Sequence, residues 1–196
     1  MRATGKRARL LLGLALLVIA SACGGGGGGG GGGVIGPSTA SFAAADPTPP
    51  ADSISLQQGS RSGLVVNVLV SATGVDDFFG AGFRLLYDPA LVRFESSNDA
   101  GSFLRDGGTP NAQLQFLVDS STSGVLNVAA TRLQNAGGTA TGVNVAGTRT
   151  LISLQFRLLA DTAGSPVTLP AAQREARDSQ ANQIALTWHA GAFLAD

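Results

Sequence analysis

The sequence contains one cysteine, one histidine and one lysine among its 196 residues. A single cysteine excludes an internal disulfide, and a single histidine excludes metal sites that need several imidazole ligands. No G-x-S-x-G nucleophile motif accompanies His189. Adjacent Asp76 and Asp77 point apart in extended chain, unlike the facing carboxylates of glycosidases, and no D-x-D-x-D-G calcium loop is present. The sequence therefore predicts a protein that is not an enzyme and holds no cofactor or metal.

Charged residues are scarce, at 13% of the chain, and four of the thirteen basic residues lie within residues 1–9. The rest of the chain carries nine arginines against thirteen acids, a net charge of −4. These arginines are scattered singly, so the sequence lacks the basic patch that neutralises phosphates. Nucleic acid is therefore excluded as the expected partner.

Residues 1–22 have the pattern of a secretory signal. The four basic residues at the start are followed by a run without charge from Leu10 to Ala22, which ends in small residues. Those 13 residues are too few to span a bilayer as a stable anchor. We therefore expect the protein to be exported.

The signal ends at Ala20-Ser21-Ala22-Cys23, which resembles the lipobox of bacterial lipoproteins. This resemblance implies that Cys23 is acylated and anchors the protein to the cell envelope, and Gly24 after it favours the outer membrane. An ordinary signal peptidase site ending at Ala22 is the alternative, with Cys23 as a bystander thiol. A free thiol on an exported protein is a liability, which favours lipidation.

A linker is expected from Cys23 to residue 51. Ten consecutive glycines, 24–33, precede a stretch rich in Pro, Ser, Thr and Ala. Such a segment buries too little apolar surface to offset the entropy of ordering it. The glycine run also lacks the Lys-Ser/Thr pair and the helix of a phosphate-binding loop.

From residue 52 to residue 196, short stretches of alternating apolar side chains are separated by Gly, Asp, Asn, Ser or Pro. This period of two predicts antiparallel strands packed into two sheets. The expected strands are 54–57, 64–72, 81–87, 92–96, 114–118, 125–131, 150–160, 167–169 and 184–188. Residues 174–181 are polar and fit at most a single helical turn.

Three segments resemble cohesin modules: Gly80–Val92 with its Tyr87-Asp88-Pro89 turn, Ser123–Ala130, and Gly147–Phe156. The resemblance covers nearly the whole domain in the right order. It implies an all-β, antiparallel jelly-roll sandwich of about nine strands. It also implies a binding module for dockerins, which in this family assemble complexes that degrade plant polysaccharides. Independently of the resemblance, Asp88 before a proline is typical of a structural turn.

The resemblance also implies a partner face, the outer side of the sheet with the third, fifth, sixth and eighth strands. In the expected register the side chains on that face are Arg84, Leu86, Gln113, Gln115, Leu117, Asn127, Ser153, Gln155 and Arg157. A polar face with a few apolar anchors is typical of a protein interface. It is equally typical of a solvated sheet face.

Two functions follow from the sequence: a membrane-tethered module that docks a dockerin-type or other protein, or a carbohydrate-binding module that holds polysaccharide at the envelope. Stacking on sugars needs exposed aromatic rings. Trp188 and Tyr87 are the only Trp and Tyr of the chain, and both lie at positions whose neighbours predict the core. This favours a protein partner.

We predict that Cys23→Ala moves the protein from the membrane fraction to the soluble fraction, because it removes the acyl chains that hold it. Fractionation of cells followed by immunoblotting measures this shift. Unchanged membrane association would contradict lipidation of Cys23.

Overall fold

The computed structural model describes residues 38–106, 113–133 and 141–195, which form eleven strands and two short 3-10 helices. The strands are β1 (Ala40–Ala44), β2 (Ser53–Ser62), β3 (Val65–Leu86), β4 (Val92–Asn98), β5 (Leu114–Asp119), β6 (Val125–Arg132), β7 (Val143–Leu158), β8 (Thr162–Val167), β9 (Arg174–Asp178), β10 (Thr187–His189) and β11 (Gly191–Ala195). The 3-10 helices are η1 (Phe103–Arg105) and η2 (Ala171–Gln173). Within the described ranges, no helix is long and apolar enough to cross a bilayer.

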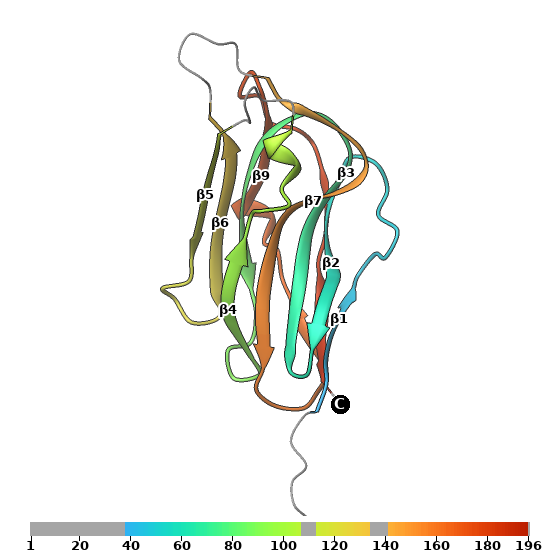
Figure 1. The fold of residues 1–196 in the computed structure, drawn as a ribbon, viewed down its shortest axis with the longest axis vertical. Helices are drawn as coiled ribbons and strands as arrows, with labels where there is room; N and C mark the ends of the chain where they lie inside the picture. Colours follow the sequence, from blue (N-terminus) through green and yellow to red (C-terminus); the bar gives the residue numbers. More distant parts are fainter. Residues whose placement is uncertain (1–37, 107–112, 134–140, 196) are drawn as a thin grey trace, which may run out of the picture. The chain divides into compact units, whose positions relative to one another are not determined.

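Strand β3 organises the sandwich, because it pairs with four other strands (Figure 1). Its first half pairs with β2 and β7, and its second half with β6 and β9. Between Thr73 and Phe78 its register against β7 shifts twice, and Gly74 and Asp77 there adopt positive φ angles of 58° and 49°. Such bulges bend a strand. Two expected strands, 64–72 and 81–87, are thus one strand shared by two layers.

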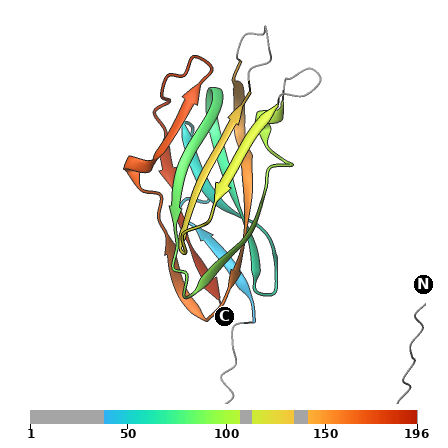
Figure 2. The same ribbon diagram turned by 90° about the vertical axis from the view of Figure 1, so that its left-hand side faces the viewer.

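In one layer the order of the strands is β9, the second half of β3, β6 and β5. In the other layer the order is β10, β2, the first half of β3, β7 and β4. A separate three-stranded sheet has the order β1, β11, β8. All pairings are antiparallel except β10 with β2, which is parallel. Figure 2 shows the layers turned by 90°. The predicted antiparallel β-sandwich is confirmed.

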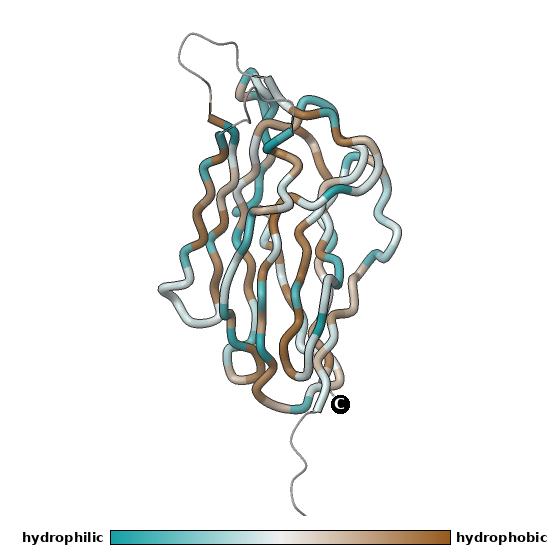
Figure 3. Tube along the Cα trace, in the orientation of Figure 1, coloured by the Kyte–Doolittle hydropathy of each residue, from teal (hydrophilic) through white to brown (hydrophobic). Residues whose placement is uncertain are grey.

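The core is built from inward positions of alternating strands, and Figure 3 shows apolar and polar residues alternating along them. At its centre, the Phe156 ring of β7 contacts Tyr87, Phe94 of β4 and Phe193 of β11, with centroid distances of 5.6, 5.6 and 4.9 Å. Edge-to-face and tilted aromatic contacts of this kind add to the stability from burial. Phe156 therefore ties one layer to the smaller sheet. Trp188 and Tyr87 pack against this core, as predicted.

The turn at Asp88 is structural, as the sequence indicates. The Ala90 amide donates to Asp88 Oδ1 at 2.9 Å, and the Val92 amide donates to the Asp88 carbonyl at 2.9 Å. Gly124 lies against this turn with a φ of 77°, and a Cβ there would come within 2.8 Å of the Tyr87 carbonyl. Only glycine fits that position without strain.

Other predictions about the elements also differ from the structure. Strand β1 (Ala40–Ala44) lies inside the predicted linker. It forms a strand because its backbone pairs with β11, and the composition of residues 40–44 does not predict this pairing. Residues 174–178 form β9 rather than a helical turn, since they pair with β3. The sequence pattern also missed β11 (Gly191–Ala195), which lies between β1 and β8.

We predict that Phe156→Ala lowers the free energy of unfolding by about 3–5 kcal/mol, because it empties a fully buried site between the layers. Denaturant unfolding followed by fluorescence measures the loss. Leu159→Ala is the control, since that side chain is 44% exposed, and a change within about 0.5 kcal/mol is expected. Equal losses for both variants would contradict the central place of Phe156.

Candidate functional site

The outer side of β9, the second half of β3, β6 and β5 forms a broad surface, here named the four-strand face. Its residues lie in rows that cross the strands. In one row Glu175, Gly82, Ala129 and Leu117 lie opposite one another in register. Side chains are small in the middle of this row and large or charged at its ends.

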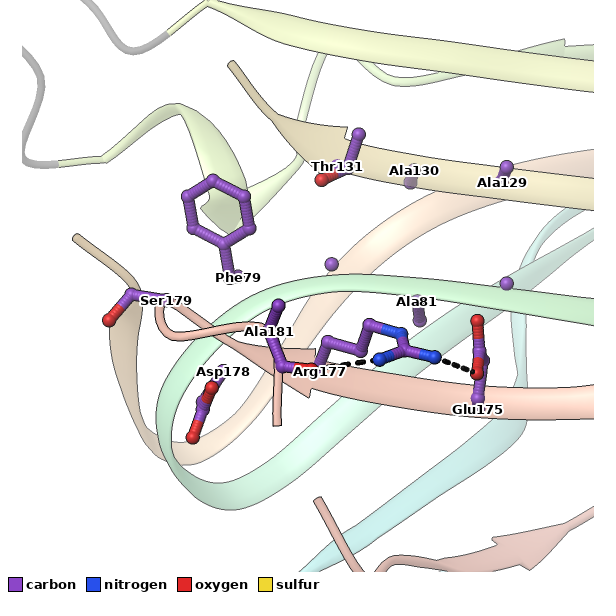
Figure 4. A pocket seen from close by; sticks show the side chains of 12 residues that line it. Phe79, Ala81, Ala129, Ala130, Thr131, Glu175, Arg177, Asp178, Ser179 and Ala181 are labelled. Atoms are coloured by element: carbon purple, nitrogen blue, oxygen red, sulfur yellow. Dashed lines mark hydrogen bonds and ion pairs between the residues drawn. The ribbon is translucent and has the colours of Figure 1, made fainter. Parts of the chain in front are cut away.

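These small residues leave a hollow of about 310 Å³ in the four-strand face (Figure 4). Its lining residues are Phe79, Gly80, Ala81, Gly82, Ala129, Ala130, Thr131, Glu175, Arg177, Asp178, Ser179 and Ala181. In Figure 4, Phe79 and Ser179 lie toward one end of the hollow and Glu175 toward the other. The floor is thus mostly backbone and methyl groups, with polar groups around it.

Glycine occupies the two floor positions, 80 and 82, for different physical reasons. A Cβ on Gly80 would lie 2.8 Å from the Thr131 hydroxyl, so β3 and β6 approach too closely for a side chain there. A Cβ on Gly82 would meet only the Val128 carbonyl, at 3.8 Å. Glycine weakens a strand and commonly marks the close approach of a ligand or another backbone. Gly82 therefore leaves open space that packing within the chain does not require.

Polar groups beside the hollow are fixed by hydrogen bonds. Arg177 donates to Glu175 at 2.8 Å and to the Ala181 carbonyl at 2.8 Å. In the next row, Arg84 donates to Asn127 at 2.8 Å. Pairing fixes these side chains before any partner arrives, which reduces the entropy lost on binding.

Asp119 ends the row that contains Arg84 and Asn127. The Ser121 backbone amide donates to its carboxylate at 2.9 Å, and the Asn127 amide donates at 3.3 Å. These hydrogen bonds, led by that of the Ser121 backbone, hold the pKa of Asp119 below its ordinary value. Asp119 therefore carries a full negative charge at neutral pH.

Leu117 is the most exposed large hydrophobic side chain among the described residues. Its side chain is 62% exposed, and it lies opposite Ala129 beside the hollow. An exposed leucine next to a small-residue floor gives the four-strand face an apolar centre with charges around it. That is the arrangement of a protein interface with an apolar core and a polar rim.

The structure brings most of the predicted face residues together. Arg84 and Leu86 lie on β3, Gln115 and Leu117 on β5, and Asn127 on β6. All five belong to strands of the four-strand layer, and exposed Gln113 directly precedes β5.

The inclusion of Ser153, Gln155 and Arg157 in this face is wrong. All three lie on β7, which pairs with the first half of β3 and with β4, in the other layer. Asn67 lies opposite Gln155 there, and Arg157 forms an ion pair with Glu95 of β4. The sequence pattern gave the correct alternation along β7 but could not tell which layer the strand joins.

Sequence reasoning missed the hollow itself and its neighbours on β9. The sequence predicts at most a helical turn for residues 174–181, so Glu175 and Arg177 have no place in the predicted sheets. The signal available in the sequence was Gly80 and Gly82 at alternate positions of one strand, which puts both on the same outward side.

Acidic side chains outside the four-strand face are paired with separate arginines and do not form one cluster. Glu95 pairs with Arg157, Asp106 with Arg149, and Asp99 with Arg105. Asp77 accepts hydrogen bonds from the Gly142 amide at 2.9 Å and the Ser179 hydroxyl at 2.8 Å, which ties three segments together. Within residues 38–106, 113–133 and 141–195, no three His, Cys, Asp or Glu side chains are grouped to hold a metal ion.

Solved structures resemble this architecture, whereas no protein-family model and no curated protein matches the sequence. A type II cohesin domain from the cellulosome of Acetivibrio cellulolyticus aligns with a TM-score of 0.56 and 17% identity, over 74% of this chain and 95% of its own. CaCohA2 from Clostridium acetobutylicum gives the same TM-score and identity, over 74% and 91%. The fold is cohesin-like.

A third structure is the sixth cohesin of Acetivibrio cellulolyticus scaffoldin B in complex with a dockerin. It aligns with the cohesin-like domain at a TM-score of 0.51 and 20% identity, over 77% of this chain and 96% of that chain. At such identities the likeness establishes the fold alone. The expectation of a cohesin-like jelly roll is confirmed.

Glu95 provides a pH test of the other layer. The hydrogen bond from Arg157 is the main cause that lowers its pKa below the ordinary 4.5, against the opposing effect of burial. A lowered pKa in the folded state stabilises the fold above the ordinary value, and that contribution disappears as the pH falls through the folded value.

We predict that Glu95→Gln lowers the melting temperature at pH 7 and that the difference from the parent disappears under acidic conditions. The expected decrease in the free energy of unfolding at pH 7 is at most about 1 kcal/mol, because the Arg157 side chain is 39% exposed and solvent screens the ion pair. Thermal unfolding across the pH range measures it. Glu175→Gln is the control, since its ion pair with Arg177 is about half exposed and contributes less. A difference that grows toward acidic pH would contradict this reasoning.

Proposed function

We propose that the cohesin-like domain is a protein-docking module, without catalytic activity, whose partner packs on the four-strand face. The observation that carries the proposal is the hollow above Gly82 and Ala129 beside exposed Leu117. It gives the face a small-residue hollow that a partner side chain can fill and desolvate, and such filled pockets dominate the binding energy of protein complexes. Two of the similar cohesins were solved in complexes with dockerins, which supports a dockerin-like partner.

The domain is proposed to be tethered to the outside of the cell by lipidated Cys23, in the outer membrane. The signal sequence and Cys23 lie outside the described residues. Sixteen residues separate Cys23 from β1. The tethered domain is proposed to recruit its partner at the cell surface, with polysaccharide degradation as the process served.

The alternative, a carbohydrate-binding module, has less support. Sugar rings bind by stacking on exposed aromatic side chains. Trp188 and Tyr87 pack against the core. Among the residues that line the hollow, Phe79 is the one aromatic side chain. Protein therefore fits the four-strand face better than polysaccharide does.

We predict that Gly82→Leu strongly weakens partner binding without loss of stability, because the new side chain fills the hollow and has room to do so. A pull-down from the secreted and envelope fractions of the source organism is expected to recover a protein with a dockerin-like module. Titration calorimetry then compares the variants, and a loss of affinity of at least about 100-fold is expected.

Gly164→Leu is the matched control. Gly164 lies on β8, outside the four-strand layer, and nothing lies within 4 Å of a Cβ there. This variant is expected to bind like the parent. Full binding by Gly82→Leu would show that the partner uses another surface. Retention on insoluble cellulose or xylan without any protein partner would favour the carbohydrate-binding alternative.

A further inference from the structure

Strand β5 is an edge that the described part of the chain leaves unpaired on one side. It pairs with β6 without a register shift, from Leu114 opposite Arg132 to Asp119 opposite Asn127. Within the described ranges β5 has no other strand partner, and it lies at the outer edge of its layer (Figure 1). A straight edge of this kind exposes a row of backbone donors and acceptors to another strand.

Three other edges of the fold, β4, β8 and β9, carry features that prevent such pairing. Strand β4 contains a bulge between Phe94 and Ser96 and the ion pair of Arg93 with Glu95. Strand β8 contains Gly164 and Pro166, and four of the five residues of β9 are charged. Bulges, prolines and charges are the usual means by which proteins block their edges.

Strand β5 has none of these features. Its sequence is Leu-Gln-Phe-Leu-Val-Asp, without glycine, proline or a basic residue, and its only charge is Asp119 at the end. The contrast with the protected edges indicates that this edge is kept open.

Both sides of β5 also carry apolar surface that another strand would cover. Leu114, Phe116 and Val118 point inward and pack against the core, but they are only partly buried. Leu117 points outward and is 62% exposed. A strand beside β5 would bury more of all four side chains.

The sequence of β5 is complementary to itself. In an antiparallel pair with a two-fold axis at Leu117, the two Leu117 side chains lie opposite each other, Phe116 lies opposite Val118, and Gln115 opposite Asp119. No like charges face each other, and cross-strand apolar pairs stabilise a sheet. Inward residues meet inward residues, so both cores extend across the junction.

We propose that β5 is a self-association edge, at which a second copy of this chain pairs antiparallel with the first. The two layers would join into one continuous sheet of eight strands. Because the axis is perpendicular to the sheet, the hollows of both copies face the same way. If the docking proposal is correct, the pair binds a partner bivalently, which raises avidity without new contacts. The pairing itself does not depend on that proposal.

The test measures self-association in the absence of any partner. The full chain with Cys23→Ala, which removes the predicted lipid, is analysed by sedimentation equilibrium up to roughly 100 μM, where the parent is expected to dimerise. Leu117→Lys and Leu117→Glu each place like charges on the axis, so each is expected to weaken dimerisation at least tenfold. Mixing the two variants is expected to restore dimers, because opposite charges then face each other.

Controls separate this edge from other contacts. Leu159→Lys makes the same substitution at a residue that is 44% exposed and lies outside β5, and it is expected to dimerise like the parent. Gly82→Leu alters the centre of the four-strand face but not the edge, so it is also expected to leave the dimer intact. Circular dichroism checks that each variant is folded.

Four outcomes would overturn the proposal. The first is a parent that stays monomeric at every concentration, and the second is a Leu117→Lys variant that dimerises as well as the parent. The third is a mixture of the charged variants that fails to associate. The fourth is loss of the dimer in Gly82→Leu, which would assign the contact to the face instead of the edge. Hydrogen exchange supports the edge if the β5 amides become protected as concentration rises.

Discussion

Backbone hydrogen bonding by β3 is the constraint on which the arrangement of the layers depends. Its 22 residues belong to both layers, and each other strand of the eight-stranded sheet pairs with β3 or with a strand that does. The register shifts between Thr73 and Phe78 let one strand cross from one layer to the other. The Asp77 carboxylate, at the bend of β3, accepts hydrogen bonds from the Gly142 amide and the Ser179 hydroxyl. These hydrogen bonds fix the bend at which the strand crosses between the layers. The position of the four-strand face follows from where the second half of β3 begins.

The candidate site is a consequence of missing side chains on that second half. Gly80 is needed because β6 lies too close for a Cβ, whereas Gly82 has free space above it. Ala129 continues the small floor on β6, and Leu117 rises beside it on β5. An apolar centre thus sits among polar groups that are already hydrogen-bonded within the chain. A surface of this kind can exclude water from a partner at little cost in side-chain entropy.

The same layer combines a face and an edge with different properties. Its β9 edge is charged and its β5 edge is apolar, so the two ends of the sheet are not equivalent toward other chains. On strand β7, in the other layer, outward side chains are not available to a partner. Its outward residues Gln155 and Arg157 hydrogen-bond with β4, so they are occupied within the domain. Alternation along a strand therefore identifies an outward side chain, but its neighbours decide whether it is available for a partner.

The sequence by itself determined the fold class, the strands with clear period-two alternation, the Asp88 turn and the inward or outward direction of the residues in those strands. These features depend on local chemistry: side-chain period, turn residues and the restriction that proline imposes. Only the tertiary structure decided which layer β7 joins, that β1 and β9 are strands, and that Gly80, Gly82 and Ala129 meet in one hollow. Strand pairing between distant segments decides these features, and a period of two carries no information about the partner strand.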